Sequence, residues 1–252
     1  MIQVQGVSQA YDQIKVVDGV DFTLPDQGMT AIIGPNGAGK STLLSMMSRL
    51  QRPQAGQILI DQLDVHQTPS RQLAKILAIL KQENHLATRL SVEDLVSFGR
   101  YPYSRGRLTP EDKQKVEEAL GFLALTDLRH RYLDELSGGQ RQRAYIAMVL
   151  CQDTRYILLD EPLNNLDMHH AVSMMQLLRR AADQMHKQVI LVLHDINFAA
   201  AYADWILAMK DGQLRYQGPP QEVISAEIMR DLYQLEMEIQ LVKGRPVAHY
   251  YR

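Results

Sequence analysis

The chain has 252 residues, of which 46% are hydrophobic, and this length and composition fit one large α/β domain with a sizeable core. Its formal net charge of −2, without a basic stretch, argues against nucleic acid as a main partner. A single cysteine, Cys151, excludes an internal disulfide and suits a reducing compartment.

The first elements in chain order lead to a glycine-rich loop. Residues 1–30 alternate polar and apolar residues and predict antiparallel strands, and the apolar run 31–33 predicts a buried strand. Residues 34–42, GPNGAGKST, fit the pattern G-x-x-x-x-G-K-[ST], and helical composition follows to Leu50. Strand, glycine-rich turn and helix are the context of a P-loop, whose backbone N–H groups and helix N-terminus bind phosphate.

The residues of this loop have separate expected roles. We expect Lys40 to reach the terminal phosphates of a nucleotide and Ser41 to bind a magnesium ion. A P-loop by itself leaves kinases, GTPases and many ATPases open. The predicted nucleotide-binding residues here are Gly34, Pro35, Asn36, Gly37, Ala38, Gly39, Lys40, Ser41 and Thr42.

The middle of the chain predicts a helical insert. Short strands are expected at 56–60 and 76–81, and between about 85 and 150 the pattern becomes helical. Thr109 and the proline after it predict a helix that runs to about Leu125, and Gly138-Gly139 open another from Gln140 to about Gln152.

After residue 155, strands and helices alternate, which indicates a parallel sheet. The expected strands are YILLD, VILVLH and WILAMK, with helices at about 167–183 and from about 195. In the tail, GQLRYQG predicts a short hairpin and residues from about 219 to 234 a helix. A helical insert therefore interrupts a P-loop α/β core.

Polar residues follow two of the predicted buried strands. Asp160 ends the strand YILLD and can hold magnesium beside Ser41, while Glu161 can act as the base for an attacking water. His194 ends the next strand. Because strand ends of an open α/β sheet bind ligands, a contact from His194 to the γ-phosphate fits this position.

A second anion site is predicted at Leu136-Ser137-Gly138-Gly139-Gln140. Serine and two glycines at a helix start present free N–H groups at the positive end of the helix dipole. The chain has one P-loop of its own, so we expect this helix tip, Ser137 to Gln140, to serve the nucleotide of another chain.

This set of motifs resembles the ATP-binding cassette (ABC) family over nearly the whole chain. GPNGAGKST is similar to its Walker A motif, LSGGQRQR to its signature and YILLDE to its Walker B motif. Gln82 matches the Q-loop glutamine, residues 164–167 match the D-loop, His194 matches the switch histidine, and Tyr11 matches the aromatic residue that stacks on adenine.

The resemblance implies a fold, cofactors and a dimer. The fold is an α/β P-loop NTPase core with an antiparallel β subdomain and an inserted α-helical subdomain. The single domain 1–252 then divides into a core at 1–84 and 155–252 and a helical signature subdomain at 85–154. ATP and Mg²⁺ are the implied cofactors, with Gln82 as a further catalytic residue and metal ligand. The dimer is an isologous, head-to-tail homodimer in which each P-loop is closed by the partner's signature.

A narrower resemblance concerns residues 91–103, SVEDLVSFGRYPY. They are similar to the importer cassettes for iron–siderophore complexes, haem and cobalamin, and we favour iron–siderophore because those cassettes are the most numerous. The alternatives are haem or cobalamin import, an exporter cassette, and a soluble ABC ATPase. Soluble members typically carry two fused cassettes or a coiled-coil insertion, and this chain has neither.

An importer of this group implies two integral membrane permease subunits, and a substrate-binding protein as an indirect partner. The first residues lack the pattern of a signal peptide, and no apolar run approaches the ~18–20 residues that span a bilayer. We therefore expect a peripheral protein at the cytoplasmic face of the inner (plasma) membrane.

Two departures from the family pattern are present. Lys81 stands where many relatives have proline, which is expected to loosen the Q-loop. Asn164 and Asn165 stand where Ser-Ala is usual, and we expect asparagine to hydrogen-bond across the dimer and tune activity rather than abolish it.

Overall fold

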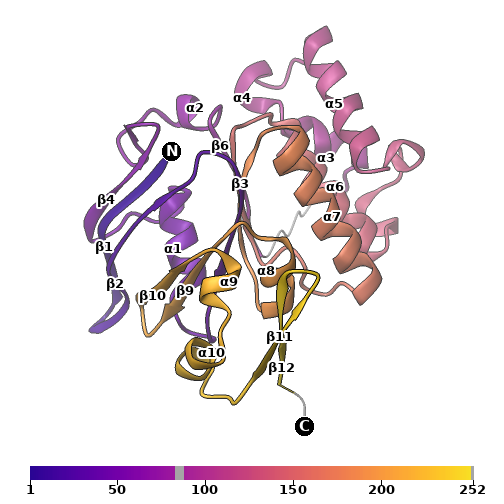
Figure 1. The fold of residues 1–252 in the computed structure, drawn as a ribbon. Coiled ribbons are helices and arrows are strands. Elements are labelled where there is room, and N and C mark those ends of the chain that lie inside the picture. The colour runs from indigo at the N-terminus through magenta and orange to yellow at the C-terminus, as the bar shows by residue number, and fades with distance from the viewer. Residues whose placement is uncertain (83–87, 251–252) are drawn as a thin grey trace.

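The computed structural model describes residues 1–82 and 88–250. Its first sheet is antiparallel, as residues 1–30 predict, with the strand order β2-β1-β4-β5. This sheet lies at one side of the molecule (Figure 1). Its strands are β1 (Ile2–Tyr11), β2 (Ile14–Leu24), β4 (Ala55–Ile60) and β5 (Leu63–Asp64).

The central sheet has the strand order β10-β9-β3-β8-β7-β6, and all neighbours except β10 and β9 are parallel. The parallel sheet expected from the alternating elements is therefore confirmed. Its parallel strands are β3 (Gly28–Ile33), β6 (Leu77–Leu80), β7 (Tyr156–Asp160), β8 (Gln188–Val192) and β9 (Trp205–Lys210). The prediction for GQLRYQG is corrected, because β10 (Gln213–Gly218) is one arm of a hairpin whose other arm is β9.

Two apolar cores cover the two faces of this sheet. Ala31 and Ile33 pack in one core and Ile32 in the other, because successive side chains of a strand point to opposite faces. A parallel sheet buried on both faces needs continuous apolar strands, which is why β3, β7 and β8 are apolar runs.

The helices fall into two groups. Those from the middle of the chain lie together, away from the antiparallel sheet (Figure 1): α3 (Val92–Phe98), α4 (Tyr101–Ser104), α5 (Pro110–Phe122) and α6 (Gly138–Cys151), with 3₁₀ turns at Thr126–Leu128 and Leu133–Glu135. The others are α1 (Lys40–Met47), α2 (Ser70–Leu73), α7 (Met168–Gln184), α8 (Ile196–Tyr202), α9 (Pro220–Val223) and α10 (Ala226–Tyr233).

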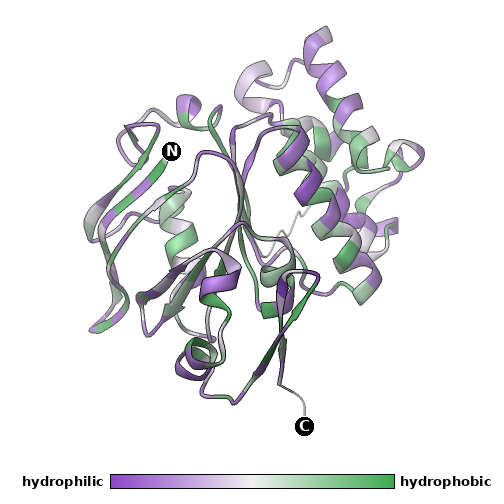
Figure 2. Ribbon diagram, viewed as in Figure 1, coloured by the Kyte–Doolittle hydropathy of each residue, from purple (hydrophilic) through white to green (hydrophobic). Residues whose placement is uncertain are grey.

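The helices combine polar and apolar residues. Figure 2 shows hydrophilic and hydrophobic residues mixed along α7, whose buried residues pack in the core cluster. Across the described ranges, none of the helices is both long and apolar enough to pass through a bilayer.

The C-terminal region differs from the prediction of one helix from about 219 to 234. That helix is broken between α9 and α10, since Ser225 is extended and its hydroxyl caps α10 by accepting a hydrogen bond from the Ile228 N–H. A hairpin of β11 (Glu238–Val242) and β12 (Arg245–His249) follows. This hairpin lies beside α8 (Figure 1), and the Asn197 amide of α8 donates to the Ala248 carbonyl at 3.1 Å.

Candidate nucleotide site

The glycine-rich loop connects β3 to α1, and glycine is required at two of its positions. At Gly34, φ is 143° and a Cβ atom would lie 2.0 Å from the carbonyl oxygen of Met209. At Gly39, φ is 93° and a Cβ atom would lie 2.3 Å from the carbonyl oxygen of Val16. Any side chain here would therefore push the loop off the neighbouring backbone.

A cavity of about 270 Å³ lies over this loop and the start of α1. Glu161 and His194 approach it from the ends of β7 and β8, and Val16, which sequence reasoning did not identify, contributes from β2. The other lining residues are Asn36, Gly37, Ala38, Gly39, Lys40, Ser41 and Thr42. The backbone N–H groups of the loop and the N-terminus of α1 give this cavity the character of an anion site.

Lys40 is the buried cation of this cavity. Its Nζ donates hydrogen bonds of 2.9 Å to the carbonyl oxygens of Gly34 and Pro35, so the side chain folds back over its own loop. Burial lowers the pKa of Lys40, although the nearby carboxylates of Glu161 and Asp160 oppose this effect. An incoming phosphate can replace the two carbonyls as the partner of this ammonium group.

Ser41 and Asp160 lie together at the edge of the sheet. The Ser41 hydroxyl donates to Asp160 Oδ1 at 2.9 Å. Burial raises the pKa of Asp160, and the charge of Glu161 raises it further against the opposing hydrogen bond from Ser41.

Hydroxyl and carboxylate oxygens fit a magnesium ion, which usually takes one or two protein ligands and completes its shell with waters and substrate phosphates. Within residues 1–82 and 88–250, no group of three or more His, Cys, Asp or Glu residues could enclose a metal by itself. Ser41 and Asp160 therefore suit a magnesium site whose remaining ligands are waters and substrate phosphates, rather than one built from protein residues alone.

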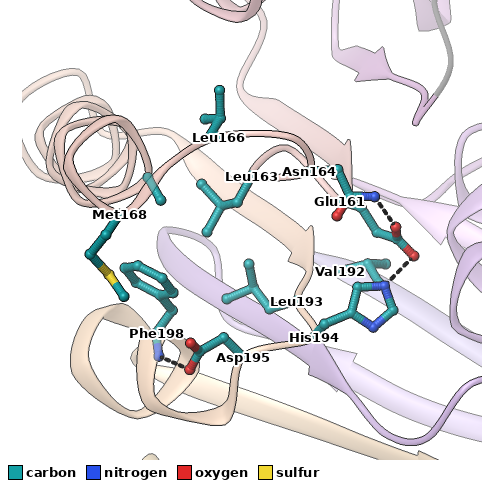
Figure 3. Close-up of a pocket in the computed structure, with 11 residues that line it drawn as sticks. Glu161, Leu163, Asn164, Leu166, Met168, Val192, Leu193, His194, Asp195 and Phe198 are labelled. Carbon is teal, nitrogen blue, oxygen red and sulfur yellow. Dashed lines mark hydrogen bonds and ion pairs between the residues drawn. The ribbon is translucent and has the colours of Figure 1, made fainter. Parts of the chain in front are cut away.

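Three side chains of the described residues contact the carboxylate of Glu161, and Figure 3 shows two of them, Asn164 and His194. Gln82 Nε2 donates to Glu161 Oε2 at 2.7 Å, and His194 Nε2 lies 2.6 Å from Oε1. Asn164 Nδ2 also donates to Oε2. The structure thus brings together Gln82, Glu161 and His194, and it adds Asn164, which the sequence had suggested would reach across a dimer.

The signature residues lie elsewhere. Ser137 caps α6, with its hydroxyl accepting from the Gln140 N–H at 3.3 Å and its own N–H donating to Gln140 Oε1 at 3.0 Å. Gly139 packs closely, since a Cβ there would lie 2.6 Å from the His170 ring. None of residues 137–140 lines the cavity over the chain's own P-loop.

Tyr11 is also outside this cavity. It ends β1 with half of its surface exposed, and its hydroxyl donates to Gln51 Oε1 at 2.8 Å.

A P-loop at the carboxyl edge of a mainly parallel sheet, with a serine–aspartate pair and a glutamate beside it, defines a P-loop nucleoside triphosphatase. The family model described as ABC transporter matches residues 17–164. The chain belongs to the ABC transporter family, and like the cassettes of that family it binds and hydrolyses ATP.

Curated relatives match over all or most of their length. The petrobactin import ATP-binding protein FatE of Bacillus anthracis is 52% identical over 99% of this chain and 100% of its own. The petrobactin import ATP-binding protein YclP of Bacillus subtilis is 47% identical over 100% of both chains. The iron(3+)-hydroxamate import ATP-binding protein FhuC of Bacillus subtilis is 37% identical over 91% of this chain and 86% of its own.

Solved structures of cassettes have the same fold. A dimeric ATP-binding cassette in a post-hydrolysis state, bound to ADP and Pi, superposes with a TM-score of 0.76 at 28% identity, covering 87% of this chain and 98% of that one. The cbiO1 protein of Clostridium perfringens, part of an ABC transporter complex, superposes with a TM-score of 0.80 at 29% identity over 91% and 92%. These likenesses confirm the expected α/β P-loop cassette fold.

Proposed function

We propose that this chain is the ATPase subunit that energises import of iron–siderophore complexes, with petrobactin as the first siderophore to test. The observation that supports this choice of substrate is the end-to-end similarity to petrobactin import ATP-binding proteins at 52% and 47% identity. A cassette does not contact the transported molecule, so this similarity, rather than any residue of the site, supports the assignment.

In this proposal the P-loop binds the phosphates of ATP, and the Lys40 ammonium pairs with the β- and γ-phosphates. Ser41, Asp160 and Gln82 would hold the magnesium ion, which would neutralise charge on the phosphate oxygens when bound. Tyr11 stacks on the adenine.

Glu161 is the general base in this proposal. Its carboxylate lines the P-loop cavity, and there it accepts a proton from the water that attacks the γ-phosphorus while ADP leaves. His194, which follows β8 at the same edge, turns from Glu161 to the γ-phosphate when nucleotide arrives.

The site is completed by a second copy of the chain. Residues 137–140 do not reach the P-loop of their own chain, while Ser137 and Gly138 are exposed at the start of α6. We propose a head-to-tail homodimer in which Ser137, Gly138, Gly139 and Gln140 close the partner's nucleotide site. This dimer sits beneath two permease subunits at the cytoplasmic face of the membrane, and a substrate-binding protein delivers the cargo to the permeases.

The catalytic assignment is tested with Glu161→Gln, which keeps the shape of the side chain but removes the base. The expected result is unchanged ATP affinity, turnover reduced by about 100-fold or more, and a stable ATP-bound dimer in size-exclusion chromatography. Glu238→Gln, an exposed glutamate on β11, is the matched control and should retain full turnover. Hydrolysis by Glu161→Gln near the wild-type rate would show that another group is the base.

The transport assignment is tested by uptake of radioactive iron into a strain that lacks the gene and carries either the wild-type chain or Glu161→Gln. Wild type should restore uptake of ferric petrobactin, and Glu161→Gln should not. Restored uptake of haem or cobalamin instead would identify one of the alternative substrates. A chain that co-purifies with no membrane permease would point to a soluble ATPase.

A further inference from the structure

Within the described chain, three side chains hold the Glu161 carboxylate: Gln82, Asn164 and His194. Under the proposed function, Gln82 and His194 contact other groups once nucleotide is bound. Gln82 then binds the magnesium ion, and His194 contacts the γ-phosphate. Asn164 is the remaining donor, and it does not line the P-loop cavity. It is therefore the donor that can stay with Glu161 through the reaction.

The backbone keeps Asn164 close to Glu161. The Asn164 N–H donates to the carbonyl oxygen of Glu161 at 3.2 Å, which closes a tight turn between β7 and α7. Leu163 and Leu166 on either side pack against the core, so the turn is anchored while the Asn164 side chain stays at the surface (Figure 3). Asn164 is three positions after Glu161 in the sequence, whereas Gln82 is 79 residues away. A local contact of this kind survives motion of the distant donors.

The two carboxylate oxygens of Glu161 have different partners. Asn164 donates to Oε2, and His194 lies against Oε1. When His194 leaves, Oε1 loses its partner while Oε2 keeps the amide. The side chain of Glu161 is only 10% exposed, so little solvent competes for this arrangement.

We infer that Asn164 is a positioning residue that orients the Glu161 carboxylate, holding Oε2 so that Oε1 faces the attacking water. This inference rests on the proposed role of Glu161 as the general base. It differs from the expectation that the asparagine at this place works across the dimer, because its amide donates to Glu161 within the chain. The role is one of geometry, since a misplacement of about 1 Å in a reacting group can cost roughly 100-fold in rate.

The test compares Asn164→Ala and Asn164→Asp with Gln217→Glu. Asn164→Asp keeps the size of the side chain but removes the donor and places a charge beside Glu161. Gln217→Glu makes the same change from amide to carboxylate at an exposed position of β10, outside the nucleotide site. We expect kcat to fall by about 10- to 100-fold in both Asn164 variants, with ATP affinity unchanged, and to stay within about twofold in Gln217→Glu.

A second arm places Asn164→Ala in the Glu161→Gln background. A residue that acts only through Glu161 should leave the residual turnover unchanged there and should leave the ATP-bound dimer intact in size-exclusion chromatography. Loss of that dimer would show that Asn164 works across the interface, and a further fall in residual turnover would show a route independent of Glu161. Either result would overturn the inference.

The two proposals fail in different ways. Turnover retained by Glu161→Gln refutes the base assignment and the positioning role together. Turnover abolished by Glu161→Gln but normal in Asn164→Ala and Asn164→Asp refutes the positioning role and leaves the base assignment standing.

Discussion

Arg100 lies at the centre of the helical region, where it joins three helices. Its Nε donates to Asp112 Oδ1 at 2.9 Å, and its Nη1 donates to the Cys151 carbonyl at 3.0 Å. The guanidinium also lies over the Tyr103 ring, 3.9 Å from its centroid. Both charged side chains of the pair are 4% exposed, so the end of α3, the start of α5 and the end of α6 meet at a buried ion pair.

We predict that Arg100→Met destabilises the protein by about 3–5 kcal/mol, the usual cost of removing one partner from a buried pair. Methionine fills similar space but supplies neither donor. Asp112 Oδ2 keeps its bonds from the Thr109 N–H and hydroxyl, while Oδ1 is left charged in an apolar environment. A second substitution, Asp112→Asn, removes that charge, and the double variant should lose only about 1–2 kcal/mol.

The assay is urea unfolding followed by circular dichroism, with Arg215→Met as the control. Arg215 is exposed on β10, and its loss should change the free energy of unfolding by no more than about 0.5 kcal/mol. A loss below about 1 kcal/mol for Arg100→Met, or a double variant no more stable than the single one, would refute the argument from burial.

The same pair predicts a pH dependence. Burial by itself raises the pKa of Asp112, but hydrogen bonds from Thr109 and Arg100 outweigh it and hold the pKa below its ordinary value. Because the folded-state pKa lies below the unfolded value of about 3.9, this stabilisation is fully present above that value. It is lost as the pH falls through the folded-state pKa, so the gap between wild type and Asp112→Asn should narrow in acid.

Two further predictions concern the nucleotide site. Lys40→Ala should weaken binding of a fluorescent ATP analogue by about 10- to 150-fold, the effect of losing one charge-assisted hydrogen bond. The control Lys113→Ala, at an exposed position of α5, should leave the affinity unchanged. Unchanged affinity in Lys40→Ala would count against the phosphate contact. Ser137→Arg should allow ATP binding but block ATP-driven dimerisation and hydrolysis, and mixing it with Lys40→Ala should restore some turnover, because one composite site then carries both lesions. If verified heterodimers stay inactive, either the sites are not shared between the chains or activity needs two intact sites. Crosslinking residue 137 to the partner's P-loop would distinguish these explanations, because it succeeds only if the sites are shared.

The element GRYPY illustrates how a sequence pattern and its physical meaning can differ. In the sequence, Gly99 and Arg100 serve only as a resemblance to importer cassettes. In the structure, a Cβ at Gly99 would lie 2.2 Å from the carbonyl oxygen of Met148, and Arg100 occupies the buried ion pair. The pattern thus marks a close approach between the end of α3 and α6, which no periodicity of the sequence predicts because Gly99 and Met148 lie far apart along the chain.

Two other differences between the prediction and the structure also have physical causes, one local and one that depends on a distant contact. The break between α9 and α10 was missed because residues 219–234 have a helical composition, whereas the extended backbone at Ser225 follows from its capping of the Ile228 N–H. The β11–β12 hairpin was missed because its stabilising contacts come partly from α8, through Asn197. Elements that depend on distant partners are not encoded in a short window of residues.

The sequence by itself determined the P-loop, the buried strands and the order of polar residues at their ends, since glycine spacing and apolar runs are local and parallel strands bring their carboxyl ends to one edge. Only the tertiary structure decided which side chains meet at that edge. It joined Gln82 to Glu161 across 79 residues, directed the Asn164 amide to the same carboxylate, and left Ser137 away from its own P-loop. Hydrogen-bond partners depend on the packing of whole elements against one another, and that packing is set by contacts spread over the entire chain.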